Sequence, residues 1–205
     1  MNAGEDARLG LQFAILGSIM GKFSLVPDIE LVPDIELLAP DEWLRLRDIR
    51  LSALRESPHA FLATYENEKG YGEERWRAEF ARGDWNIGLI KGRAVSLLGV
   101  TREPGAPAQE CYLEYLWVAH EYRRSGVARN MLAVIIERLR ISGTTTVFLW
   151  VLDGNETAMQ FYKNIGFIRS NHRQPLPEDP ERSEELMRLD LVPGSPIPVP
   201  PSAWS

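Results

Sequence analysis

An apolar strand that runs into an arginine-rich turn and then a long amphipathic helix constrains this chain most. The apolar run CYLEYLWV ends at Val118, and Gly126 precedes residues 127–140, whose apolar members recur at helical spacing. The first N–H groups of a helix have no intrahelical acceptor and lie at the positive end of the helix dipole, so they attract phosphate. The sequence therefore predicts an anion-binding turn between a strand and a helix.

The charge of this turn supports that interpretation. Residues 123–140 contain five arginines and one glutamate, although the formal net charge of the whole chain is −6. Neither a G-x-G-x-x-G dinucleotide fingerprint nor a P-loop lysine occurs here, which excludes those two kinds of phosphate site. The alternative is a helix that begins with solvated charges and binds nothing.

A second motif lies on the helix expected over 155–164. Asn155, Ala158 and Tyr162 are spaced i, i+3 and i+7, so they share one helix face. The small Ala158 lets a ligand pass along the helix, while Asn155 and Tyr162 offer it polar groups. Taken alone, Tyr162 is more often a core residue than a catalyst.

Helices and strands alternate along the rest of the chain. Apolar periodicity and capping residues predict helices over 41–55, 73–81, 127–140 and 155–164. Apolar and β-branched runs predict strands over 35–38, 86–90, 94–100, 111–118, 145–152, 167–170 and 186–191. A helix that crosses between two of these strands indicates a mixed α/β sheet.

The 205 residues exceed one ordinary domain, and the excess lies at both ends. Residues 1–34 form an N-terminal extension in which LVPDIE occurs in tandem, at 25–30 and 31–36. Only the second copy is needed for the first strand. Residues 193–205 form a proline-rich tail, which leaves 35–192 as a single expected domain.

Composition excludes several classes of function. The acidic balance argues against a nucleic-acid partner, and the apolar stretch 9–20 is too short to cross a membrane. The single cysteine, Cys111, cannot form a disulfide within the chain, so a reducing, cytoplasmic location is expected. The three histidines lack metal-ligand spacing, and no metal is expected.

Together the two motifs resemble those of the GNAT acetyltransferases. The turn is similar to the family signature R/Q-x-x-G-x-G/A through Arg123, Gly126 and Ala128, and the segment 155–167 resembles a second family block. The resemblance covers about residues 35–192. It implies a mixed, mostly antiparallel central sheet flanked by about four helices, with acetyl-CoA as the acetyl donor.

The resemblance also implies where acetyl-CoA is held, between the strand that ends at Val118 and the strand over 145–152. Main-chain groups of Leu116 and Val118 would bind the pantetheine as an added strand would, with Asn155 and Ala158 alongside. The pyrophosphate would be held by the backbone amides of Arg124, Gly126, Val127 and Ala128, assisted by Arg123 and Arg129. Arg124 departs from the family pattern, which usually has glycine at this position.

Glu114 is the candidate general base for acetyl transfer to an amine. It is a charged residue within an apolar strand, where an unpaired buried carboxylate is costly, so its presence needs a reason. A structural ion pair is the alternative reason. In diamine acetyltransferases with a similar YLE-x-x-x-V strand, the matching glutamate is the proposed base. The resemblance likewise implies that Tyr162 is the general acid toward the CoA sulfur.

The expected function is acetyl-CoA-dependent transfer of an acetyl group to the primary amine of a small molecule, directly in a ternary complex. Cys111 is expected in the core and not as an acetyl carrier. Residues 175–190 carry six acids and two arginines, which would favour a cationic amine if they border the acceptor. Acetylation of a protein amine and a non-catalytic acyl-CoA sensor are the alternatives. The family also suggests a homodimer.

Overall fold

A seven-stranded sheet forms the centre of the protein in a computed structural model, which describes residues 31–176 and 179–191. The strands lie in the order β1-β2-β3-β4-β5-β7-β6, and every neighbouring pair is antiparallel except β4 and β5. The strands are β1 (Asp34–Leu37), β2 (Gly83–Ile90), β3 (Arg93–Thr101), β4 (Glu110–Val118), β5 (Thr146–Leu152), β6 (Ile168–Leu176) and β7 (Asp179–Asp190).

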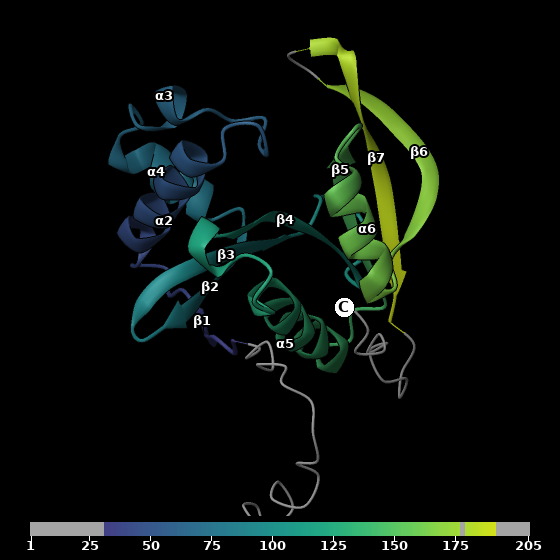
Figure 1. Cartoon of the computed structure of the whole chain (residues 1–205), viewed down its shortest axis with the longest axis horizontal. Coiled ribbons are helices and arrows are strands. Elements are labelled where there is room, and N and C mark those ends of the chain that lie inside the picture. Colours follow the sequence, from purple (N-terminus) through teal and green to yellow (C-terminus); the bar gives the residue numbers. More distant parts are fainter. Residues whose placement is uncertain (1–30, 177–178, 192–205) are drawn as a thin grey trace, which may run out of the picture.

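Five α-helices and one short 3-10 helix surround the sheet in the described part of the chain (Figure 1). They are α2 (Trp43–Glu56), α3 (Tyr65–Glu68), α4 (Glu73–Phe80), the 3-10 helix η1 (His120–Tyr122), α5 (Val127–Ile141) and α6 (Glu156–Ile165). The apolar faces of α5 and α6 share one core with β5, and those of α2 and α4 share a second core with β2 and β3. The helices therefore cover both faces of the sheet, as an α/β fold requires.

The alternation along β5 divides these two cores. Val147, Leu149 and Val151 are buried against α5 and α6, because successive side chains of a strand point to opposite faces. The residues between them, Phe148 and Trp150, therefore face the side on which α2 and α4 lie. They are only half-buried, and Trp150 lines the cavity described below.

The parallel pair β4 and β5 separates after a short ladder. Pairing runs from Glu110 opposite Thr146 to Tyr112 opposite Phe148 and includes no residue beyond them. The rings of Tyr112 and Phe148 stack at this last pair, with their centroids 5.3 Å apart. Beyond it the two strands diverge, so main-chain groups at the end of β4 face an opening in the middle of the sheet.

The observed fold confirms the expected mixed, mostly antiparallel sheet. The hairpin of β6 and β7 is much longer than the strands expected over 167–170 and 186–191. Its polar sequence pairs as strands because arginines on β6 meet a carboxylate on β7: Arg169 and Arg173 both contact Glu185. The helix α3 was not expected from the sequence.

The first strand begins in the second copy of LVPDIE, ends one residue beyond it at Leu37, and pairs with β2. The first copy, the rest of the extension before residue 31 and the tail 193–205 lie outside the described residues. Within the described ranges, no helix is long and apolar enough to cross a membrane.

Candidate functional site

A cavity of about 540 Å³ opens where β4 and β5 separate. Leu113 to Leu116 line it from β4, Trp150 to Leu152 line it from β5, and Asn155, Ala158 and Tyr162 line it from α6. The remaining lining residues come from the segment before α4, from the loops after α4 and after β3, from β4 and from β7: Ala60, Phe61, Leu62, Ala63, Asn67, Tyr71, Arg82, Glu103, Tyr112 and Glu184. The strand that carries Glu114 and the helix motif of Asn155, Ala158 and Tyr162 therefore meet at one cavity.

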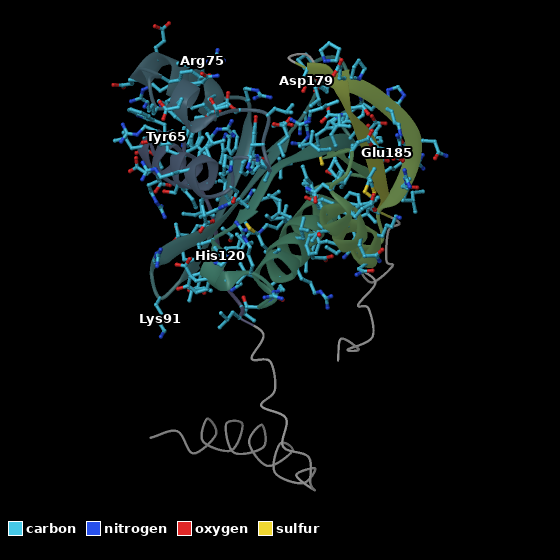
Figure 2. The ribbon with its side chains drawn as sticks, turned by 45° about the horizontal axis from the view of Figure 1, so that its top comes forward. Tyr65, Arg75, Lys91, His120, Asp179 and Glu185 are labelled. Atoms are coloured by element: carbon cyan, nitrogen blue, oxygen red, sulfur yellow. The ribbon has the colours of Figure 1, made fainter. Side chains whose placement is uncertain are left out.

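The two sides of this cavity differ in chemistry. The side formed by α6 is polar but uncharged, with Asn155 and Tyr162 on either side of the small Ala158. The charged lining residues are Arg82, Glu103, Glu114 and Glu184, three carboxylates against one guanidinium. Figure 2 shows the helical side, marked by Tyr65 and Arg75, and the hairpin, marked by Asp179 and Glu185, on opposite sides of the molecule.

Glu114 is placed at the cavity wall by β4. Its Oε1 accepts a hydrogen bond of 3.0 Å from the Thr101 hydroxyl on the neighbouring strand, and its Oε2 lies 3.5 Å from Nη2 of Arg82. The Glu114 side chain is 27% exposed, so the carboxylate is partnered yet still reached from the cavity. The ion pair that is the alternative explanation for Glu114 is therefore present, and the carboxylate also faces the cavity.

A β-bulge follows Glu114 and shapes the wall. β3 and β4 pair at Gly99 with Glu114 and again at Leu97 with Trp117, so β4 contains one extra residue between the two pairs. Tyr115 within the bulge has a left-handed φ of 59°. The bulge interrupts the ladder at Tyr115 and Leu116 and turns the Tyr115 ring into the cavity lining.

The Tyr115 ring is held between two side chains of the second core. Trp85 stacks on it with ring centroids 5.5 Å apart, and the Arg50 guanidinium lies over it, 3.8 Å from its centroid. Arg50 is buried and paired with the equally buried Glu68 of α3. The hydrogen bonds and charge of Glu68 raise the pKa of Arg50, although burial alone would lower it. This part of the cavity wall is therefore rigidly supported.

Tyr162 projects from α6 toward the cavity between two other aromatic rings. Its ring meets those of Phe161 and Phe167 edge to face, with centroids 5.3 and 5.6 Å apart. Burial raises the pKa of the Tyr162 hydroxyl above its ordinary value, because the low-dielectric surroundings disfavour the phenolate. The side chain is therefore a neutral phenol that holds its proton at neutral pH.

Asn155 is the N-cap of α6. Its Oδ1 accepts a hydrogen bond of 3.1 Å from the Ala158 N–H, which satisfies one of the free donors at the helix start. The side-chain amide Nδ2 is left to donate toward the cavity that Asn155 lines. The helix ends at Gly166, whose left-handed φ of 108° fits a C-terminal glycine.

A second, smaller hollow of about 140 Å³ lies at the start of α5. It is lined by Val118, Tyr122, Arg123, Arg124, Gly126, Val127, Ala128 and Arg129. The first helical hydrogen bond runs from the Asn130 N–H to the Gly126 carbonyl, at 2.9 Å. The N–H groups of residues 126–129 therefore have no acceptor within the helix and are available to an anion.

The arginines expected at this turn differ in their surroundings. Arg123 is engaged by the protein itself: Nε donates to the Val118 carbonyl at 3.0 Å, and Nη2 lies 2.7 Å from the Ser57 hydroxyl and 3.1 Å from Glu56. Arg124 is exposed and has a left-handed φ of 61° at the position where the resemblance led us to expect glycine. Arg124 and Arg129 both line the hollow.

Nearby residues at the end of β4 line the two hollows. Leu116 lines the larger one and Val118 the smaller, so the main chain expected to bind a pantetheine arm runs from one to the other. The Val118 carbonyl already accepts from Arg123, which reduces what that residue can offer a ligand. The main-chain contribution of Val118 to pantetheine binding is therefore expected to be smaller than the resemblance implies.

Several other reactive or aromatic side chains lie outside both hollows. Cys111 is fully buried in the first core, and burial raises the pKa of its thiol to about 11, so it is an inert core residue as expected. Trp76 and Trp85 are also core residues. His120 is exposed on η1 (Figure 2). Among residues 31–176 and 179–191, no group of three or more potential metal ligands is found.

Sequence reasoning missed several residues of the site. Arg82 lies between α4 and β2, and its importance follows from its contacts with Glu79 and Glu114 and not from any local pattern. Glu103 is in the loop before β4, and nothing in the sequence of this loop distinguishes it from its neighbours. Glu184 belongs to the acidic segment that we expected to favour a cationic acceptor if it bordered the site, and it does line the cavity.

Comparison with known proteins identifies a family. The model of the Acetyltransferase (GNAT) family matches residues 42–167. "Uncharacterized N-acetyltransferase YdgE" of Bacillus subtilis is 29% identical over 89 residues, which cover 43% of this chain and 57% of the relative. The "[Ribosomal protein bS18]-alanine N-acetyltransferase" of Haemophilus ducreyi is 30% identical over 86 residues, which cover 40% and 59%. The chain thus spans less than two thirds of either relative.

Solved structures agree in fold. The ribosomal-protein-S18-alanine N-acetyltransferase of Escherichia coli superposes with a TM-score of 0.58 at 18% identity, covering 80% of this chain and 97% of that one. An acetyltransferase of the GNAT family from Streptococcus pneumoniae gives a TM-score of 0.64 at 15% identity, covering 78% and 99%. At these identities the likeness concerns the fold alone.

Proposed function

Because the chain belongs to the GNAT acetyltransferase family, we propose that it transfers the acetyl group of acetyl-CoA to the primary amine of a small cationic molecule. Family membership supports an N-acetyltransferase activity, and the acceptor and the residue roles belong to the same proposal. The observation that carries it is the cavity in which Glu114 of β4 and Tyr162 of α6 meet beside the separated strands.

The residues present fit acetyl-CoA. The free N–H groups at 126–129 and the arginines at 124 and 129 offer donors and positive charge to a pyrophosphate. The bulge frees main-chain groups at Tyr115 and Leu116 for the pantetheine, and Nδ2 of Asn155 can donate to it. When bound there, acetyl-CoA supplies an acetyl thioester. The guanidinium of Arg123 acts indirectly in this proposal, by holding the turn in place.

In this proposal Glu114 is the proton acceptor and Tyr162 is the proton donor of the reaction. An amine is mostly protonated at neutral pH, so Glu114 accepts a proton from the acceptor and leaves a nucleophilic nitrogen. As the C–N bond forms and the C–S bond breaks, the Tyr162 hydroxyl would donate its proton to the departing sulfur, and the new amide nitrogen would then lose its extra proton, which restores the tyrosine. Thr101 and Arg82 hold the Glu114 carboxylate in place for this role.

The charge of the cavity supports a cationic acceptor. Glu103, Glu114 and Glu184 line it together with several aromatic rings, and its one lining guanidinium, Arg82, is already paired with carboxylates. Carboxylates attract an ammonium group by charge, and aromatic faces attract it through their quadrupoles. An acceptor molecule without a positive charge would lose both interactions.

A second candidate is acetylation of a protein N-terminus. Two of the similar proteins are named as ribosomal-protein alanine N-acetyltransferases. Release of the CoA thiol should be measured with three acceptors: a small diamine, a monoamine of similar size without a second charge, and a peptide with an N-terminal alanine. A preference for the diamine supports the proposal, whereas a preference for the peptide would replace it.

A further inference from the structure

The second copy of LVPDIE reaches across the start of α5. The Leu31 N–H donates a hydrogen bond of 2.7 Å to the Ser125 carbonyl, and the Leu31 carbonyl accepts one of 3.2 Å from Nδ2 of Asn130. Further along, the Ile35 carbonyl accepts a bond of 3.2 Å from Nη2 of Arg138. We call residues 31–35 the N-terminal strap.

The strap brackets the residues that provide free N–H groups. Ser125 comes immediately before residues 126–129 and Asn130 immediately after them, and Leu31 binds both through one peptide unit on each side of its Cα. Neither Leu31 nor Ser125 lines the small hollow at the helix start. The strap therefore supports the turn from outside the hollow and leaves the hollow open.

The bond to Ser125 acts on the orientation of a single peptide. The described chain has no cis peptide bonds, so the Ser125 C=O and the Gly126 N–H, which share one planar unit, point in opposite directions. Holding the carbonyl toward Leu31 directs the Gly126 N–H away from the strap. Gly126 has a left-handed φ of 88°, and glycine otherwise has access to many backbone conformations. The strap limits that freedom at the first donor of the turn.

The strap is itself anchored firmly. β1 pairs with β2 from Asp34 onward, and a Cβ added at Gly88 of β2 would lie 3.2 Å from Cβ of Pro33 and 3.4 Å from Cδ1 of Ile35. The strap thus packs directly on the backbone of β2. Leu31 also packs against the second core, so the donor N–H is held in place by its own side chain.

We infer that the N-terminal strap positions the pyrophosphate-binding turn, with Leu31 and Asn130 as positioning residues that act through Ser125 and the start of α5. The inference rests on the proposed cofactor site. It assigns a function to the second LVPDIE copy besides supplying the first strand of the sheet. It also predicts that loss of the hydrogen bonds between Leu31 and the start of α5 affects the phosphate end of the cofactor and spares the thiol end.

The test compares CoA with pantetheine, which lacks the pyrophosphate and the nucleotide. Leu31→Pro removes the donating N–H, and Asn130→Ala removes the second hydrogen bond without touching the strap. Val32→Pro is the matched control, since the Val32 side chain is 75% exposed and its N–H has no backbone acceptor among the described residues. Dissociation constants for both ligands are measured with the full chain, by calorimetry for CoA and by NMR titration for pantetheine.

Loss of one such hydrogen bond is expected to raise the dissociation constant of CoA by about threefold to tenfold in Leu31→Pro and in Asn130→Ala. Pantetheine binding is expected to stay unchanged in both variants, and Val32→Pro is expected to match the wild type. Unchanged CoA binding in both variants, or equal weakening of both ligands, would overturn the inference alone. A wild type that does not bind CoA would overturn the cofactor proposal and the inference with it.

Discussion

The guanidinium of Arg123 lies 3.1 Å from the carboxylate of Glu56, which joins the turn before α5 to the last residue of α2. The same carboxylate accepts hydrogen bonds of 3.0 Å from the Trp117 indole and 2.9 Å from the His120 N–H. One side chain thereby binds the end of β4, the 3-10 helix and the arginine of the turn. Glu56 is a structural centre beside the proposed phosphate site.

Replacing Glu56 should loosen this turn. Glu56→Ala leaves the Trp117 indole, the His120 N–H and the Arg123 guanidinium without their shared acceptor, so we expect the free energy of unfolding to fall by about 1–3 kcal/mol. The dissociation constant of CoA should rise as well. Urea unfolding and calorimetry measure the two effects. Glu121→Ala, which removes an exposed partner of Arg93, is the control and should change neither. A Glu56→Ala protein with wild-type stability and affinity would contradict the account.

The phenol of Tyr162 should matter for turnover and little for binding. Tyr162→Phe removes the proton donor but keeps the ring that packs on Phe161 and Phe167. Loss of a general acid lowers kcat by about 100-fold or more, while the dissociation constant of acetyl-CoA should stay within about twofold. Phe161→Leu, a change in a neighbouring ring, controls for packing. An unchanged kcat in Tyr162→Phe would remove the hydroxyl from the mechanism.

Glu114→Gln should change the pH dependence of the reaction. Without the carboxylate the enzyme depends on acceptor amine that has already lost its proton in solution, and this fraction grows with pH. We therefore expect the rate defect of Glu114→Gln to be largest near neutral pH and to shrink as pH rises. Thr101→Val, which removes only the hydrogen bond to Glu114, should show a smaller defect. A pH-independent loss of rate would make Glu114 a structural carboxylate.

Glu185 should contribute to stability in a pH-dependent way. Its hydrogen bonds and ion pair with Arg169, aided by Arg173, hold its pKa below the ordinary value against the opposing effect of burial. Because the unfolded chain then binds more protons in acid, this stabilisation is complete above the ordinary glutamate pKa of about 4.3 and is lost as pH falls through the lower folded value.

Glu185→Gln should accordingly be less stable than the wild type at pH 7, by about 1–2 kcal/mol, since the two arginines are partly exposed and can be hydrated. The difference should shrink as the pH is lowered from 5 to 3. Chemical unfolding at a series of pH values measures this. A constant difference between the two proteins across that range would contradict the assignment.

The fold followed from sequence wherever apolar periodicity was strong. The face of α5 with Met131 and Ile135, and the alternation of Val147 and Leu149 on β5, indicate a helix and a strand without further information. The long β6–β7 hairpin could not be predicted in this way. Its strands are mostly polar and are stabilised by pairs such as Arg169 with Glu185, which become visible only once the two strands are aligned.

The site was predictable to the same extent. Glu114, Tyr162 and Asn155, which the sequence singled out, line one cavity in the structure, and their roles there stay predictions. The side chain of Arg123, expected near the phosphate, lines the small hollow and is also bonded to Glu56, 67 residues earlier in the chain. A partner so distant in sequence leaves no local signal. The same holds for the contact of Arg82 with Glu114.

An NMR titration with acetyl-CoA tests the central claim most directly. If the cofactor lies between the separated strands, the backbone amides of 115–118, 126–129 and 155–158 should shift together and saturate with one dissociation constant. The amides around the separate hollow between α2 and β2, near Ile49 and Ile87, should not move. Shifts confined to the hollow between α2 and β2 would contradict the account, as would the absence of any shift with acetyl-CoA in large excess.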